Sequence, residues 1–172
     1  MKKYVFLFLL TILSNPSFAN SPVELGEYGD WTAYSYKEGK NTVCYMASTP
    51  KKDEGNYKVR GDIYAIVTHR PAEKSYDVVN FVAGYNYKKN SNVVVKIGAT
   101  TFNNLFTSGT NAWDPDSKTD KKLVQEMKRG QKLIVEGVSF KGTKTKDTYS
   151  LSGFNLTRIY KSSLRNSLCI LI

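Results

Sequence analysis

Short runs that mix apolar and polar residues, separated by turn residues, are the dominant pattern along the chain. They are rich in Val, Ile, Tyr, Thr and Phe, and they cover residues 30–36, 42–48, 62–69, 76–83, 92–97, 100–107, 132–140 and 148–154. Runs of this length and composition, bounded by Gly, Pro, Asn and Asp, are typical of antiparallel β-strands. The pattern therefore predicts an all-β domain, built as a sandwich or a small barrel.

One segment has helical spacing instead. Residues 118–129 can begin behind a cap at Asp116 or Ser117, and a glycine follows their end. The apolar positions of this segment share one face: Leu123, Val124 and Met127. The expected fold is thus an antiparallel β-domain with one short helix at about residues 118–129.

The first nineteen residues have the composition of a secretory signal peptide. Two lysines precede the uncharged residues 4–13, and small residues stand at positions minus three and minus one before a cut after Ala19. The uncharged run is much shorter than the roughly 20 apolar residues that cross a bilayer, which disfavours an uncleaved anchor helix. We expect residues 1–19 to be removed. Residues 20–172 then form one exported domain without a transmembrane segment.

The net charge of +10 over 172 residues is unevenly distributed. Without residues 1–19 the chain keeps 23 bases and 15 acids, and residues 20–117 hold 11 of each, so the surplus lies after residue 117. Only 5 of the 25 bases are Arg, which is the residue that base readout and phosphate capture favour, so nucleic-acid binding is not indicated. The surplus indicates a solvated face or a docking surface for an anionic partner. The candidate residues there are Lys121, Lys122, Lys128 and Arg129.

Several short motifs in a fixed order resemble those of the invasion-associated locus B family of exported bacterial proteins. They are Trp31, Cys44-Tyr45-x-Ala47-Ser48, Arg60-Gly61, Thr68-His69-Arg70-Pro71, Phe81-Val82-Ala83-Gly84-Tyr85, Ala112-Trp113 and Asp147 to Phe154. The resemblance implies an immunoglobulin-like β-sandwich in the periplasm or at the outer envelope, with surface or host interaction in some members. It implies no established reaction.

The chain has two cysteines, Cys44 on a predicted strand and Cys169 near the end. In an oxidising compartment a disulfide between them is the economical expectation, with two buried free thiols or one reactive thiol as alternatives. Closing so long a loop would stabilise the fold by roughly 4 to 5 kcal/mol in the chain-entropy treatment. The bridge would also hold the apolar end, residues 168–172, against the domain.

Metal, cofactor and enzyme chemistry find little support. The chain has one histidine and no paired Cys or His spacing for zinc, and its acidic residues at 114, 116 and 120 lack the Gly and Glu of a calcium loop. We expect them to form a turn and a helix cap. His69, beside Arg70 at a strand end, could be the base of a hydrolase, but no nucleophile elbow accompanies it. We therefore expect neither cofactor nor metal, and no enzyme.

Trp113 stands out because residues 108–116 are predicted to be a loop. It could plug one end of a sandwich or stand exposed as a binding anchor. With His69, Arg70 and the basic helix residues it completes the candidate binding surface. The leading hypothesis is a non-enzymatic module that binds another envelope protein, a host protein or an anionic surface. The alternatives are a periplasmic chaperone that adds a client strand to a sheet edge, and the hydrolase.

The disulfide can be tested on the exported protein by mass spectrometry. A Cys44–Cys169 bridge lowers the non-reduced mass by about two units relative to the reduced mass, because two thiol hydrogens are lost. Alkylation of both cysteines without prior reduction would contradict the bridge.

Overall fold

The computed structural model describes residues 21–155. The predicted signal peptide and its cut, together with Cys169 and the apolar end at 168–172, lie outside the described residues. The strands are β1 (Val23–Tyr28), β2 (Trp31–Glu38), β3 (Asn41–Ser48), β4 (Lys52–Gly55), β5 (Tyr64–Arg70), β6 (Ser75–Val82), β7 (Val93–Ile97), β8 (Thr100–Ser108), β9 (Asn111–Trp113), β10 (Lys132–Val138) and β11 (Lys144–Ser150). A 3-10 turn, η1 (Pro71–Glu73), and one helix, α1 (Ser117–Arg129), complete this range.

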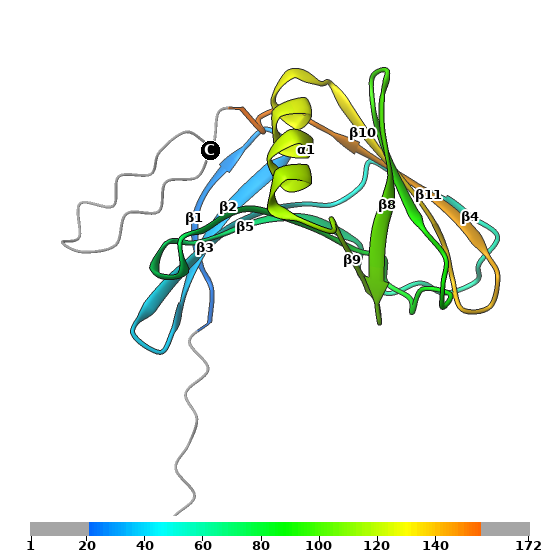
Figure 1. The fold of residues 1–172 in the computed structure, drawn as a ribbon, viewed down its shortest axis with the longest axis horizontal. Coiled ribbons are helices and arrows are strands. Elements are labelled where there is room, and N and C mark those ends of the chain that lie inside the picture. Colours follow the sequence, from blue (N-terminus) through cyan, green and yellow to red (C-terminus); the bar gives the residue numbers. More distant parts are fainter. Residues whose placement is uncertain (1–20, 156–172) are drawn as a thin grey trace, which may run out of the picture.

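All strand pairs are antiparallel, and they form one continuous sheet in the order β1-β2-β3-β5-β6-β9-β8-β7-β10-β11-β4. The sheet folds over itself into two halves. Figure 1 shows β1, β2, β3 and β5 on one side, β8, β10, β11 and β4 on the other, and α1 at one end of the space between them. The predicted fold class, a mostly antiparallel β-domain with one short helix, is confirmed.

Strand β8 joins the two halves. Its first part pairs with β7, and Phe106 to Ser108 pair with β9. Between these parts Val93 faces Leu105 and Val95 faces Phe102, so β8 carries one extra residue in a β-bulge. A bulge bends its strand and increases the local twist. Here the bend turns β8 from one half of the sheet into the other.

The core fills the space between the halves. Its largest fully buried side chains include Trp31, Phe81 and Phe154. The rings of Trp31 and Phe154 meet edge to face with centroids 4.9 Å apart. Trp31, on β2, also donates its indole N–H to the carbonyl oxygen of Ser150, on β11, at 3.0 Å. This hydrogen bond ties the halves together away from β8.

Helix α1 forms as its sequence predicts. Asp116, rather than Ser117, is the cap, and its Oδ1 accepts the backbone N–H groups of Lys118 and Thr119. The predicted apolar face is buried in the core. The helix ends at Gly130, which is extended, and an added Cβ at this position would lie 2.5 Å from Cγ2 of Ile97. Within residues 21–155 no helix has the length and apolar character needed to cross a membrane.

Four local predictions were wrong. Strands β1 and β4 were not predicted; the Lys, Asp and Glu residues of β4 give no apolar alternation. Trp113 lies on β9 and not in the predicted loop. The prediction missed this strand because three residues are too few to give a strand pattern. The last strand is Lys144–Ser150 and not 148–154. Its start was missed because two of its inward residues, Thr145 and Asp147, are polar and conceal the alternation.

Asp147 faces inward because Arg60 neutralises it. The guanidinium donates two hydrogen bonds to the two carboxylate oxygens at 2.6 Å each, and its Nε–H donates to the carbonyl oxygen of Ala83. Both side chains are about 95% buried. Burial opposes the charge of Arg60, but the hydrogen bonds and the charge of Asp147 outweigh that effect and raise its pKa further. The ion pair therefore links the loop before β5 to β11 through the interior.

Removing one member of this pair should destabilise the fold strongly. Arg60→Met leaves a buried, unpaired carboxylate, for which we expect a loss of about 3–5 kcal/mol in the free energy of unfolding. The double variant Arg60→Met/Asp147→Leu removes both charges and should recover much of that loss. Urea unfolding of the three proteins at pH 7 measures this. A double variant no more stable than Arg60→Met would contradict the role of the unpaired charge.

Candidate binding cleft at Trp113

A cleft of about 500 Å³ lies where β9 ends and the chain turns towards α1. Its lining combines aromatic rings with two acidic side chains: Val78, Phe106, Ser108, Trp113, Asp114, Pro115 and Asp120. The residues come from β6, β8, β9 and the start of α1. Trp113, which the sequence singles out, thus belongs to the cleft.

The strand register places the aromatic residues on the outer face of the sheet. Asn80 on β6 pairs with Trp113, which pairs with Phe106 on β8, while the alternating residues Phe81 and Ala112 point into the core. The rings of Phe106 and Trp113 are stacked, with centroids 5.6 Å apart and an angle of 24° between them. Phe106 is 52% exposed and Trp113 is half-buried. Trp113 therefore does not plug one end of the sandwich, and a flat aromatic surface faces solvent.

Asp114 is a buried carboxyl group beside this stack. The residue is 6% exposed, and neither carboxylate oxygen has a hydrogen-bond partner among the described residues. Burial is the main cause that raises its pKa to about 7, and the negative charges of Asp120 and Asp116 add to the shift. The group is therefore half-ionised near neutral pH.

Asp120 is also buried, but it has a structural task. Because β9 ends at Trp113, the N–H of Val79 on β6 has no neighbouring strand on that side, and Oδ1 of Asp120 accepts it at 2.9 Å. Burial raises the pKa of Asp120 to about 6; the bond from Val79 opposes the shift, and the charges of Asp116 and Asp77 increase it. The bond to Val79 leaves Oδ2 for other partners.

The arrangement is chemically suited to binding. An aromatic stack supplies apolar contact area, and the ring faces attract cations. Two buried carboxyl groups supply acceptors and negative charge above pH 7. Within residues 21–155 no cluster of three or more His, Cys, Asp or Glu side chains is placed to hold a metal ion.

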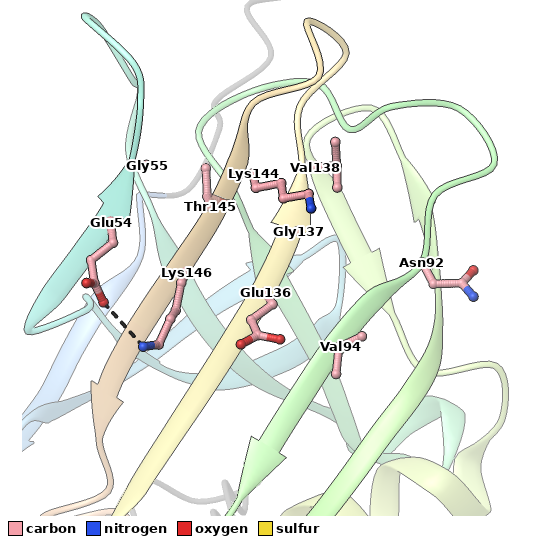
Figure 2. A pocket seen from close by; sticks show the side chains of 10 residues that line it. All are labelled: Glu54, Gly55, Asn92, Val94, Glu136, Gly137, Val138, Lys144, Thr145 and Lys146. Carbon is pink, nitrogen blue, oxygen red and sulfur yellow. Dashed lines mark ion pairs between the residues drawn. The ribbon is translucent and has the colours of Figure 1, made fainter.

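Another hollow, of about 510 Å³, lies on the second half of the sheet (Figure 2). Val94, Glu136, Lys144, Lys146 and Glu54 line it from the four strands β7, β10, β11 and β4. Its charges compensate one another, since Lys146 pairs with Glu54 at 3.7 Å and Glu136 pairs with a neighbouring lysine of β7. Paired side chains of this kind are typical of a solvated sheet face. The cleft at Trp113 differs because its buried carboxyl group is unpartnered.

His69 lies on the opposite face from Trp113. It is 3% exposed, neither ring nitrogen has a hydrogen-bond partner among the described residues, and Nε2 is 3.8 Å from Oδ1 of Asp77. Burial lowers its pKa; the charge of Asp77 opposes this and that of Lys128 adds to it. A hydrolase needs a nucleophile in hydrogen-bond contact with its base. Among residues 21–155 no nucleophile is in hydrogen-bond contact with His69.

The other predicted surface residues are dispersed. Arg70 is on the outer face of the sheet and engages Glu38 and the hydroxyl of Tyr36. On α1, Lys121, Lys122 and Arg129 are exposed and Lys128 is half-buried. Lys144 and Lys146 lie on β11, where they line the hollow of Figure 2. Within the described residues the bases after position 117 are therefore divided between α1 and the strands of the second half of the sheet. Cys44 is fully buried on β3, and its predicted bridge stays a prediction.

Three cleft residues were not identified as candidates from the sequence. Asp114 and Asp120 were expected to form only a turn or a cap, which holds for Asp116, and their burial depends on the early end of β9. Phe106 reaches Trp113 only through strand pairing. The one available signal was the presence of an aromatic residue in each of the two neighbouring segments 100–107 and 108–116.

Comparison with known proteins supports the fold. Residues 31–157 match the family described as invasion associated locus B (IalB) protein. The structure is similar to the crystal structure of invasion associated protein b from Bartonella henselae, with a TM-score of 0.53 and 17% sequence identity, covering 78% of this chain and 90% of that chain. No curated protein sequence matches.

Asp114 should make stability depend on pH. Its folded pKa of about 7 exceeds the ordinary 3.8, so its stabilising contribution is full below pH 4 and is lost as the pH rises to 7. Asp114→Asn removes this loss. Relative to the wild-type protein, the free energy of unfolding of the variant should therefore rise between pH 4 and pH 8, by at most about 1.4 kcal/mol per pKa unit.

Urea unfolding at pH 4, 5.5, 7 and 8 measures the difference. Asp116→Asn is the matched control, because hydrogen bonds from the first turn of α1 lower the pKa of this exposed group. Its contribution is present above about pH 4 and is lost only below that pH, so the control should show no gain between pH 4 and pH 8. The same difference for Asp114→Asn at every pH would contradict the raised pKa.

Proposed function

The chain belongs to the invasion-associated locus B family, and from that premise we propose that it is an exported, non-enzymatic binding domain that acts in the bacterial envelope or at its surface. The binding surface is the outer sheet face around Trp113, and the partner is another protein of the envelope or of a host. Export is supported by the signal-peptide pattern of residues 1–19.

The observation that carries this proposal is the exposed stack of Phe106 and Trp113 beside an unpartnered buried carboxyl group. Large aromatic side chains dominate the energetics of protein interfaces, and adjoining exposed apolar side chains often mark an interaction site. The register continues the same outer row across the sheet through Asn80, Ile66 and Ala47 to Thr32. A partner can therefore rest on a flat surface, with the cleft at one end of it.

The chaperone alternative requires a sheet edge that accepts a client strand. In the described part of the chain, β1 and β4 are the two ends of the sheet. Strand β4 has only four residues, three of them charged, and β1 is interrupted by a register shift between Glu24 and Gly26. Short, charged and bulged edges are protected against strand addition. The face around Trp113 thus explains binding better than the edges do.

Trp113→Ala should abolish partner capture without unfolding the domain. The side chain lies on the outer face and contributes no buried core volume, so we expect a loss of about 1 kcal/mol or less in the free energy of unfolding. A photo-crosslinking residue in place of exposed Ser108 should capture one defined partner from intact cells, and Trp113→Ala should remove that product.

Phe140→Ala is the matched control, because Phe140 is an exposed aromatic residue, at 60%, outside the cleft. It should leave capture unchanged. Capture of many unfolded clients would favour the chaperone alternative. A large fall in melting temperature for Trp113→Ala would place the residue in the core and contradict the proposal.

A further inference from the structure

We propose that the cleft at Trp113 receives an arginine side chain of the partner protein, with the guanidinium between the aromatic stack and Asp114. This inference rests on the proposed binding function and specifies the chemistry of the partner. Three properties of the cleft support it: unsatisfied acceptors, a flat aromatic wall and uncompensated negative charge.

The acceptors come from Asp114 and Asp120. Asp114 is 94% buried as a residue and offers two oxygens without partners among the described residues. Asp120 uses Oδ1 for the N–H of Val79 and retains Oδ2. A buried carboxylate without hydrogen bonds is costly, whereas an arginine can donate two parallel N–H groups to it. The planar guanidinium carries five donors in a fixed geometry, which an ammonium group lacks.

The aromatic wall suits the rest of the same side chain. Phe106 and Trp113 form a stack that borders the cleft together with Val78 and the ring of Pro115. A guanidinium lies favourably over an indole face, and the aliphatic stem of arginine packs on apolar surface. A neutral apolar group could use the wall but would leave Asp114 without partners. An anion would be repelled by both carboxylates.

The charges around the cleft are predominantly negative. Asp116 caps α1 with Lys118 beside it, and Asp120 lies in the first turn of the helix; Asp77 of β6, next to His69, adds its negative charge only at Asp120. The remaining cleft residues of β8 and β9 are uncharged. Burial, with the negative charges of Asp120 and Asp116 adding to it, raises the pKa of Asp114 to about 7, so the carboxyl group keeps its proton up to about that pH. A bound cation favours the ionised carboxylate, so binding should strengthen as the pH rises from 5 to 8.

The test is an NMR titration of the full exported protein with acetyl-Gly-Arg-Gly-amide. The two tryptophans give two indole N–H signals, and Trp31, which is 1% exposed and bonded to Ser150, is the internal control. We expect the peptide to shift the Trp113 signal and the amides of Val78 and Ser108, but not the Trp31 signal. The same peptide with citrulline, which is neutral and of equal shape, should bind at least about tenfold more weakly.

Asp114→Asn should weaken arginine binding by at least about tenfold at pH 8 and remove its pH dependence, which in the wild-type protein should also reach about tenfold between pH 5 and 8. Phe140→Ala should change neither quantity. Equal binding of the citrulline peptide, shifts confined to other regions, or no effect of Asp114→Asn would each overturn the inference.

These outcomes separate the inference from the proposed function. If Trp113→Ala abolishes partner capture while the arginine peptide leaves the Trp113 signal unmoved, the proposed binding surface is supported and the inference that it receives an arginine is contradicted. If the peptide binds as expected while Trp113→Ala leaves partner capture intact, the cleft takes arginine but the partner uses another surface, and the proposed function fails.

Discussion

The bend of β8 is the constraint on which the rest of the structure depends. A single strand takes part in both halves of the sheet, and the extra residue between Phe102 and Leu105 sets the direction in which the sheet folds over. Both of those side chains still point into the core because the bulge restores the inward direction after the bend. The space between the halves is then filled by Trp31, Phe81 and Phe154, and α1 covers its open end. The position of β9, and with it the cleft, follows from where β8 emerges from the bend.

The sequence predicts the elements whose signals are local. Helix α1 carries its own cap, its apolar face and its final glycine within about fifteen residues, so its existence and limits follow without tertiary information. The central strands β3, β5 and β6 are similar, since their buried residues alternate. The signal is absent where a strand is defined by its neighbours. Strand β4 is polar throughout, and β11 turns Asp147 inward only because Arg60, distant in the sequence, meets it there.

The candidate site divides in the same way. Trp113 can be selected from the sequence because a tryptophan between turn residues is unusual. Its stacking partner cannot, because Phe106 reaches it through strand pairing across the β8–β9 turn. The burial of Asp114 depends on the end of β9 and on the start of α1 together, and no local pattern encodes that meeting. The basic residues show the converse: their proximity in the sequence suggested a single face, whereas the fold distributes them between α1 and β11.

The brevity of β9 has a consequence for how this fold can vary. With three residues, β9 covers only Asn80 to Val82 of β6 and leaves the residues before them uncovered, and an aspartate of α1 takes the place of the missing strand at Val79. One or two more residues in β9 would extend the ladder over that edge and displace the aspartate, turning the cleft into ordinary sheet without disturbing the core. Relatives of the same architecture can therefore gain or lose such a cleft through the length of a single strand.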